Sequence, residues 1–292
     1  MILATRRSPL ALAQTELIAA RLRAAGHEAE ALPLTTTGDR WSAEDRAPAP
    51  DRGMFVKELE EALLDGRADL AVHSAKDLPG EIPEGLAIAA VPPREDPRDV
   101  LIGPAGGLDA LPSGARVATG SPRREAQLRA IRPDLSIVPI RGNVGTRLDK
   151  LARGEADALV LAAAGLRRLG LWPDGTTPLP VDVSTPAPGQ GLLAVEALAD
   201  AALAAAAAEA LDDPTAHACL RAERSFLAEL GGGCMRPVGA LCEDAGGGRL
   251  RITAFAGGVT GGPGGRTERE GPADDPEDLG RVAAAVVAHV LR

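Results

Sequence analysis

Residues 4–9 read Ala-Thr-Arg-Arg-Ser-Pro, and residues 118–122 repeat the arrangement as Ala-Thr-Gly-Ser-Pro. In both places an apolar strand candidate ends at Ala-Thr, a short turn follows, and Ser-Pro begins a helix. Serine is a preferred N-cap and proline a preferred first helical residue, and the exposed N–H groups of such a helix start form an anion site. Either copy alone fits simple helix capping, but with arginines beside both copies the repeat predicts two facing lobes, each with an anion site beside a cleft.

Outside this repeat, short apolar strand candidates alternate with amphipathic helices through the first two-thirds of the chain. The strand candidates are 2–4, 29–34, 70–73, 115–119, 135–140 and 158–162, and the helices are 9–25, 54–65 and two that start at 122 and 146. Such alternation is typical of open α/β sheets with largely parallel strands, whose ligands lie at the carboxyl ends of the strands.

The pattern changes after residue 213. A helix near 214–230 precedes the alternating strand candidates 238–243, 249–256 and 266–270 and a last helix that starts near 276. This order predicts a small α+β domain with an antiparallel sheet. Proline-rich segments at 91–93 and 179–191 indicate where the chain crosses between lobes. We therefore predict lobe 1 at 1–92 and 189–213, lobe 2 at 97–186, and a C-terminal domain at 214–292.

Arginine is concentrated in one part of the chain. Residues 119–147 hold six arginines, at 123, 124, 129, 132, 141 and 147, against Glu125 and Asp134, so the segment is net +4 while the chain is net −9. The guanidinium group binds carboxylates in a planar fork and stays charged at physiological pH. Basic turns in an acidic chain predict a pocket for a small, multiply negative molecule.

Composition argues against several classes of function. A pI near 5.1 and an aromatic content of 2% argue against nucleic-acid binding, which uses basic surfaces and stacking aromatics. Three cysteines at spacings that match no zinc signature predict neither a disulfide framework nor a metal site. The chain has no apolar run of about 18 residues and no secretory pattern at its start, so we expect a cytoplasmic protein without a membrane span.

Two short motifs carry possible chemistry. Cys234 follows three glycines, on a loop that a ligand can approach closely, which favours covalent attachment or nucleophilic chemistry, while Cys219 and Cys242 fit buried apolar positions. Lys76 and Asp77 follow a strand candidate, so they are either a solvated turn or charged groups at the edge of the cleft. The apolar-poor stretch 36–53 is either disordered or a lid.

Seven segments together resemble the porphobilinogen deaminase family, also called hydroxymethylbilane synthases. They include Phe-Val-Lys-Glu-Leu-Glu at 55–60, His-Ser-Ala-Lys-Asp at 73–77 and Arg-Gly-Asn-Val-Gly-Thr-Arg-Leu at 141–148. The remaining segments are 4–12, 94–99, 188–191 and 232–234. The resemblance is ordered along the chain and reaches into the C-terminal domain, although each motif alone would be weak.

The resemblance implies an α/β fold of two doubly wound lobes of the periplasmic-binding-protein type with mostly parallel sheets, plus the C-terminal α+β domain. It implies a transferase that condenses four porphobilinogen molecules head to tail, loses ammonia each time, and releases linear hydroxymethylbilane by hydrolysis. A dipyrromethane cofactor, bound covalently through a thioether to the residue matching Cys234, primes the reaction, and the residue matching Asp77 is catalytic. The substrate carries an acetate and a propionate, which explains the arginines.

The resemblance also assigns the remaining site residues. Cofactor binding is implied for Lys76, Thr119, Ser121, Arg123 and Arg124. Substrate binding is implied for Arg6, Ser8, Arg52, Phe55, Arg141, Arg147, Arg168 and Gln190. The chain departs from the family pattern around the expected lid, where Arg52 is the nearest basic residue before Phe55 and where Thr37 occupies a place that often holds arginine.

Two other function classes fit parts of the sequence. A two-lobed carboxylate-binding protein without catalysis would share the lobes and anion sites, but it predicts an export signal and does not need Cys234. A thiol-dependent hydrolase would use Cys234 but lacks a recognisable histidine motif. The family reading further implies a monomer whose product passes to uroporphyrinogen-III synthase, with no nucleic-acid or membrane partner.

Overall fold

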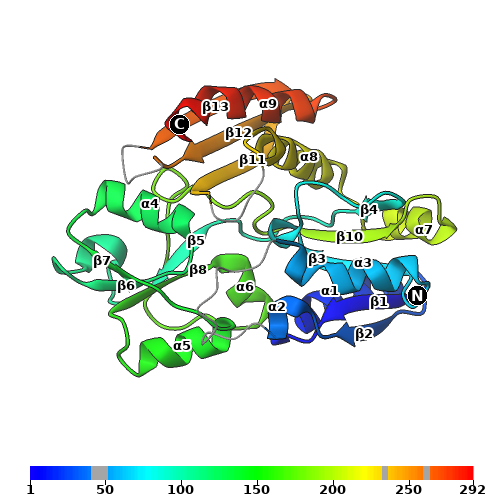
Figure 1. Cartoon of the computed structure of the whole chain (residues 1–292), viewed down its shortest axis with the longest axis horizontal. Helices are drawn as coiled ribbons and strands as arrows, with labels where there is room; N and C mark the ends of the chain where they lie inside the picture. Colours follow the sequence, from blue (N-terminus) through cyan, green and yellow to red (C-terminus); the bar gives the residue numbers. More distant parts are fainter. Residues whose placement is uncertain (41–51, 232–235, 259–263, 292) are drawn as a thin grey trace.

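The computed structural model describes residues 1–40, 52–231, 236–258 and 264–291. Within these ranges the chain forms two five-stranded sheets and one three-stranded sheet, and Figure 1 shows the three-stranded sheet above the other two. Each sheet has its own helices. We call the three parts lobe 1, lobe 2 and the C-terminal domain.

Lobe 1 is built on the sheet with strand order β2-β1-β3-β10-β4. Its strands are β1 (Ile2–Arg6), β2 (Glu30–Leu34), β3 (Leu70–Ser74), β4 (Leu86–Ala90) and β10 (Leu193–Leu198), and its helices are α1 (Pro9–Ala24), α3 (Lys57–Leu64) and α7 (Ala202–Leu211). Ile18 and Leu22 of α1 pack with Leu3 in one buried cluster, while Leu59 and Leu63 of α3 belong to a second one. The sheet therefore has an apolar core that involves helices on each face.

Lobe 2 repeats this plan with the order β7-β6-β8-β5-β9. Its strands are β5 (Asp99–Ile102), β6 (Arg116–Ala118), β7 (Ser136–Val138), β8 (Ala158–Ala162) and β9 (Thr176–Pro178), and its helices are α4 (Pro122–Ile131), α5 (Val144–Ala152) and α6 (Ala163–Arg168). Ser8 caps α1 and Ser121 caps α4, each followed by proline, so the repeated motif starts a helix in both lobes.

Each five-stranded sheet contains one reversed strand. In lobe 1, β10 pairs antiparallel with β3 and with β4, while β1 pairs parallel with β2 and β3. In lobe 2, β5 pairs antiparallel with β8 and β9, while β6 pairs parallel with its two neighbours. Four strands of each sheet thus point one way. The reversed strand is in each case the first one after the chain has crossed from the other lobe.

The C-terminal domain is a three-stranded antiparallel sheet with two helices. Strands β11 (Val238–Gly246), β12 (Arg249–Ala256) and β13 (Gly265–Pro272) pair in order, and α8 (Pro214–Glu229) and α9 (Pro276–Val287) pack against each other. Phe226 of α8 is fully buried in this core with Ile252 and Leu279. A side chain at Gly280 of α9 would meet the Ala222 carbonyl oxygen at 2.2 Å, so only glycine permits this close helix contact.

The predicted fold class, α/β lobes with a C-terminal α+β domain, is confirmed. The prediction missed strands β4, β5, β9 and β10 and helices α6 and α7. The expected helix at 54–65 is instead a 3-10 turn, η1 (Arg52–Phe55), followed by α3, and the start of the expected 36–53 loop is a helical turn, α2 (Thr37–Arg40). Residues 41–51 lie outside the described ranges. The domain boundaries themselves stay a prediction.

None of the helices in the described part of the chain combines the length and the apolar composition that crossing a bilayer requires.

Candidate active site

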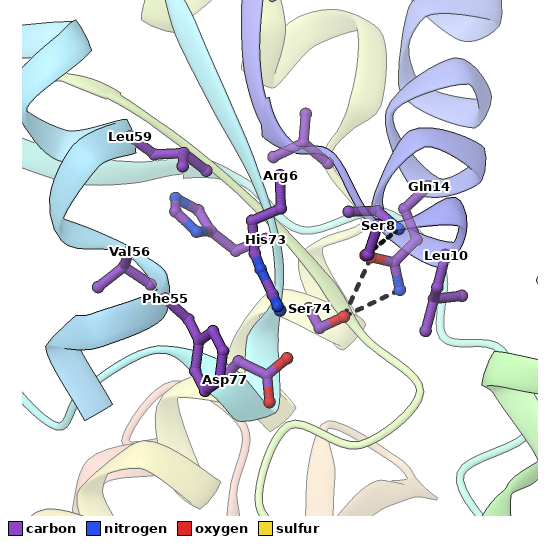
Figure 2. Close-up of a pocket in the computed structure, with 12 residues that line it drawn as sticks. Arg6, Ser8, Leu10, Gln14, Phe55, Val56, Leu59, His73, Ser74 and Asp77 are labelled. Carbon is purple, nitrogen blue, oxygen red and sulfur yellow. Dashed lines mark hydrogen bonds between the residues drawn. The ribbon is translucent and has the colours of Figure 1, made fainter. Parts of the chain in front are cut away.

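A small cavity of about 50 Å³ lies at the carboxyl ends of β1 and β3. Its lining residues are Arg6, Ser8, Leu10, Ala11, Gln14, Phe55, Val56, Leu59, Val72, His73, Ser74 and Asp77. Figure 2 shows the Arg6 guanidinium and the Asp77 carboxylate on the same side of this pocket as the Phe55 ring. The structure therefore brings together four residues predicted from the sequence, namely Arg6, Ser8, Phe55 and Asp77.

Arg6 is held in place by a carboxylate and an aromatic ring. Its Nε atom donates to Oδ1 of Asp39 at 3.2 Å, and its guanidinium lies 4.2 Å from the centre of the Phe55 ring. Burial alone would raise the pKa of the Asp39 carboxyl, but the ion pair with Arg6 and hydrogen bonds from Thr36 lower it. Asp39 therefore stays ionised and aligns Arg6 beside the pocket.

The Phe55 ring also packs against a glycine. A Cβ atom at Gly38 of α2 would lie 2.1 Å from a carbon of the Phe55 ring. The ring therefore fills the space that a larger residue at 38 would need. Thr37, which stands where the family often has arginine, donates from its N–H and from its hydroxyl to Oε1 of Glu58, both at 2.7 Å. It therefore anchors α2 to α3.

The opposite wall of the pocket is formed by the start of α1. Ser8 accepts a hydrogen bond from the Ala11 N–H at 3.2 Å, and the Gln14 amide exchanges hydrogen bonds with the Ser74 hydroxyl at 2.9 and 3.0 Å. The positive end of the α1 dipole and the Arg6 cation therefore meet at this wall. This arrangement suits a carboxylate.

The floor of the pocket contains a buried acid–histidine pair that the sequence did not suggest. Nε2 of His73 lies 3.0 Å from Oε2 of Glu196, and the Glu196 side chain is fully buried. Burial raises the pKa of the neighbouring Glu60 carboxyl, and the charge of Glu196 adds to the rise. Figure 2 shows the His73 ring turned toward Leu59 and away from Asp77.

Lys76 and Asp77 lie in the short turn η2 (Ala75–Asp77), directly after β3. Both residues are half-buried. Burial lowers the pKa of the Lys76 ammonium group to about 8; Asp77 opposes this change, and the charge of Arg124 reinforces it. The ammonium is therefore poorly solvated and would be stabilised by an added negative charge.

Arg123 and Arg124 of α4 converge on one buried carboxylate, Asp99 of β5. Nη1 of Arg123 donates to Oδ2 of Asp99 at 2.8 Å, and Nη2 of Arg124 donates to Oδ1 at 2.7 Å. Burial alone would raise the pKa of the Asp99 carboxyl, but the two guanidinium groups hold it well below its usual range. The hydroxyl of Ser184 and the amide of Gln190 also donate to this carboxylate.

The sequence predicted both arginines as cofactor ligands but did not reveal Asp99. Arg123 also donates to the Thr185 carbonyl oxygen at 2.6 Å, and Arg124 donates to that of Val160 at 3.1 Å. Much of their hydrogen-bonding capacity is therefore used inside the protein. Their role as cofactor ligands stays a prediction. The structure adds that both arginines also stabilise lobe 2.

We expect Asp99→Asn to lower the free energy of unfolding by about 3–5 kcal/mol, because it leaves two buried guanidinium groups without a counter-charge. The matched control is Asp157→Asn in the exposed pair with Arg116, which should lower the stability far less because water screens both charges. Urea unfolding midpoints of the two variants measure the difference. Similar losses in both would contradict this reading.

The other predicted cofactor residues lie at the start of α4. Thr119 is buried, and its hydroxyl accepts from the Ser121 N–H at 3.2 Å, while the Ser121 hydroxyl accepts from the Arg124 N–H at 3.4 Å. A side chain at Gly120 would meet the Ile140 carbonyl oxygen at 2.8 Å, so the turn lies tightly on the strand end. These hydroxyls are thus held on a rigid turn.

The predicted arginines of the 141–147 turn differ in exposure. Arg141 is exposed, whereas Arg147 is half-buried and donates through Nε to the Gly142 carbonyl oxygen at 2.7 Å. Burial lowers the pKa of the Arg147 guanidinium, the charge of Arg124 adds to this, and Asp77 opposes it. Arg147 of lobe 2 therefore lies within electrostatic reach of Asp77 in lobe 1.

Gln190 lies where the chain returns from lobe 2 to lobe 1, and Arg168 at the end of α6 contacts this return. Nη2 of Arg168 donates to the Gly191 carbonyl oxygen at 2.6 Å, and burial lowers the pKa of this guanidinium to about 10. Gln190 is buried and donates to the Pro97 carbonyl oxygen at 2.7 Å, while its Oε1 has no hydrogen-bond partner within the described ranges. Gln190 thus joins the two crossings, and Arg168 joins α6 to the return.

Several cations lie within electrostatic reach of one another around Lys76. The Lys76 ammonium interacts with Arg123 and Arg124 as well as with Asp77 and Asp99, and Arg147 interacts with Arg124 and Asp77. A poorly solvated positive charge is costly unless an opposite charge binds beside it. The cluster therefore fits a ligand that carries carboxylates.

The predicted cysteines and Arg52 differ in whether the described residues include them. Cys234 lies outside the described residues, and the Arg52 side chain is likewise not described. Cys219 and Cys242 are both buried, as the sequence predicted. No group of three or more His, Cys, Asp or Glu side chains in the described ranges is arranged to hold a metal ion.

Solved structures with a similar arrangement include solute-binding proteins. A nutrient binding protein from Burkholderia cenocepacia bound to methionine is 12% identical with a TM-score of 0.42, covering 71% of this chain and 89% of that chain. A periplasmic substrate-binding protein of an ABC transporter from Coxiella burnetii is 15% identical with a TM-score of 0.43, covering 74% of this chain and 94% of that chain.

Comparison of sequences finds proteins that are much more similar to this chain. Residues 1–206 match the family described as "Porphobilinogen deaminase, dipyromethane cofactor binding domain", and residues 217–288 match its C-terminal domain. The porphobilinogen deaminase of Roseiflexus castenholzii is 48% identical over 287 residues, or 97% of this chain and 94% of the relative. That of Acidothermus cellulolyticus is 50% identical over 292 residues, or 97% and 87%. A match over both domains and nearly the whole length shows that this chain belongs to the porphobilinogen deaminase family.

Proposed function

We propose that this chain condenses four porphobilinogen molecules head to tail and releases linear hydroxymethylbilane by hydrolysis. Family membership supports the reaction. The observation in this chain that carries the proposal is the cavity in which Asp77 lies with the Arg6 cation and with Ser8 at the start of α1. Each porphobilinogen brings an acetate and a propionate, so a growing chain of rings needs such a cationic site.

Each addition breaks one bond and makes another. The C–N bond of the substrate aminomethyl group breaks and ammonia leaves, a C–C bond forms to the α-carbon of the acceptor ring, and that carbon then loses a proton. The departure of ammonia leaves the substrate ring electron-poor. In our proposal the Asp77 carboxylate accepts a hydrogen bond from the pyrrole N–H, stabilises this positive charge, and then moves the released proton.

The substrate carboxylates are proposed to bind arginines on both sides of the cleft. Arg6 and Ser8 present a cation and a helix start beside Asp77, and Phe55 offers a ring face for the pyrrole. From the other lobe and the crossing we propose Arg141, Arg147, Arg168 and Gln190, and the family resemblance adds Arg52. Because the product lengthens at each cycle, we expect several arginines to contact different rings at different stages.

The dipyrromethane cofactor is proposed to be joined by a thioether to Cys234. When bound, it supplies the α-carbon to which the first substrate is joined. The donors at the start of α4 and the poorly solvated ammonium of Lys76 suit its carboxylates. We propose that Lys76, Thr119, Ser121, Arg123 and Arg124 hold it, with Arg123 and Arg124 already fixed in direction by Asp99.

The deciding experiment is a turnover assay of the purified protein with porphobilinogen. We expect hydroxymethylbilane and four ammonia molecules per product. Saturable binding of porphobilinogen without either product would instead identify a carboxylate-binding protein and would refute the proposed reaction.

The lowered pKa of Lys76 makes a prediction about stability and pH. The folded-state pKa of about 8 lies below the ordinary value of 10.5, so between these pH values the unfolded chain binds more protons than the folded one. The Lys76 contribution to stability should therefore rise with pH across this window. We expect this rise in the Cys234→Ser protein, which has no cofactor, and its loss on adding Lys76→Met.

Thermal or urea unfolding between pH 7.5 and pH 10 of the two proteins provides the measurement. The cofactor-bound wild type should show a smaller rise, because a bound carboxylate stabilises the ammonium. Parallel stability curves with and without Lys76 would contradict the assignment.

Further features follow from the family reading. We propose that the protein acts as a cytoplasmic monomer and that its product passes to uroporphyrinogen-III synthase, because a linear tetrapyrrole must next be closed into a ring. Analytical ultracentrifugation tests the monomer, and a coupled assay with the synthase tests the transfer.

A further inference from the structure

Glu223 is a fully buried carboxylate of α8 that contacts both lobe crossings. Its Oε1 accepts from Nη2 of Arg94 at 2.6 Å and from the Cys242 N–H at 2.7 Å, and its Oε2 accepts from the Gly189 N–H at 2.5 Å. Arg94 lies on the crossing from lobe 1 to lobe 2, and Gly189 lies on the return. A residue of the C-terminal domain thus joins both crossings.

Gly189 lies directly against the turn that carries Lys76 and Asp77. It has a φ of +78°, and a Cβ atom there would lie 2.8 Å from the Ala75 carbonyl carbon and 2.8 Å from the Lys76 nitrogen. Real Cβ atoms do not approach backbone atoms so closely, so only glycine at 189 lets the return crossing pack directly on the Ala75–Lys76 peptide. In addition, the Ala75 N–H donates to the Leu192 carbonyl oxygen at 3.1 Å.

The next residue of α8, Arg224, contacts the chain just after this turn. Arg224 donates through Nη1 to the Pro79 carbonyl oxygen at 2.9 Å and through Nη2 to the Gly80 carbonyl oxygen at 2.8 Å. Carbonyls held by a charged donor are restrained more strongly than by a neutral one. The segment 75–80 is therefore fixed by α8 on both sides of Asp77.

We propose that Glu223, acting through Gly189, and Arg224, acting through the Pro79 and Gly80 carbonyls, are positioning residues for Lys76 and Asp77. Neither residue lines the pocket beside Asp77. The proposal rests on the proposed function for the roles of Lys76 and Asp77. It assigns to the C-terminal domain the task of setting the geometry of a site that belongs to lobe 1.

The first test pairs two glycines. Gly189→Ala should lower kcat for porphobilinogen roughly ten- to a hundred-fold while KM changes little, because displacing a reacting group by about 1 Å costs that much. Gly154→Ala is the matched control, since Gly154 has a φ of +74° and no atom within 4 Å of the added Cβ. It carries the same kind of backbone strain but should retain the wild-type kcat.

The second test pairs two arginines of α8. Arg224→Met removes both carbonyl contacts and should also lower kcat roughly tenfold or more, whereas Arg221→Met removes only the exposed pair with Glu277 and should not. Arg224→Lys, which can restore one charged contact, should recover part of the loss. This pair decides the question if Gly189→Ala does not fold.

The outcomes separate this inference from the function on which it rests. A folded wild type without turnover overturns both. A wild type with turnover, combined with normal kcat in folded Gly189→Ala and Arg224→Met, overturns the positioning role and leaves the reaction intact. A loss that appears equally in Arg221→Met or Gly154→Ala would show a general effect on stability, and it too overturns the positioning role.

Discussion

Asp77→Asn should lower kcat for porphobilinogen condensation by about 10²–10³-fold, the usual cost of removing a group that stabilises charge developing in the transition state. The amide keeps the size of the carboxylate but lacks its charge. Asp77 borders the same cavity as Arg6 and Phe55, so loss of the charge acts where the substrate ring is expected. Turnover of porphobilinogen at saturating substrate is the measurement.

The control for this variant is Asp65→Asn, which alters an exposed carboxylate paired with Arg67 at the end of α3. It should keep the wild-type kcat, and both variants should unfold within a few degrees of the wild type. Near-normal turnover of a folded Asp77→Asn protein would reject the proposed role.

Cys234→Ser should abolish condensation altogether, because the serine cannot form the thioether on which the product is built. Intact-mass analysis is the direct measurement. Protein expressed in cells that make porphobilinogen should be heavier than its sequence by two linked pyrrole units, and the Cys234→Ser protein should have the mass of its sequence alone.

The buried cysteines provide the control for this experiment. Cys219→Ala changes a thiol that is packed in the core of the C-terminal domain, and it should retain the added mass. An unmodified wild type, or an adduct that persists in Cys234→Ser, would contradict the assignment of the cofactor to this residue.

The lobes could be predicted wherever a local signal decides the structure. The Ser-Pro starts of α1 and α4 and the apolar strands β1, β3 and β8 depend on neighbours in the chain, and the sequence located them closely. Strands β5 and β10 were missed because they are short apolar runs without alternation, each containing a buried acid, Asp99 and Glu196. Their reversed direction depends on the lobe crossings, which no local pattern shows.

The same distinction applies to the site. Asp77 and Arg6 could be predicted from motifs, and the structure brings both to one cavity. The partners that orient the arginines, Asp39 and Asp99, could not, because they depend on which strands and turns are adjacent in space. Glu223 was missed for the same reason, since an acid on a helix far along the chain gives no sign of contacting both crossings.

The counter-charges also change how the arginines are understood. A pair at 123 and 124 suggested two similar ligands for one polyanion, but both guanidinium groups converge on the same internal carboxylate. Their charge still contributes to the field around Lys76. Electrostatic attraction of the substrate and the structural integrity of lobe 2 therefore depend on the same residues.

The placement of β10 between β3 and β4 has a consequence for the order in which the lobes mature on the ribosome. The last strand of lobe 2 ends at residue 178. In lobe 1, by contrast, the only described strand that pairs with β4 is β10, so β4 has no partner until residues 193–198 have been synthesised. Domains generally fold as units while synthesis proceeds. Lobe 2 begins later in the chain but can complete its sheet first. The lobe 1 sheet keeps an unpaired edge until β10 has left the ribosome.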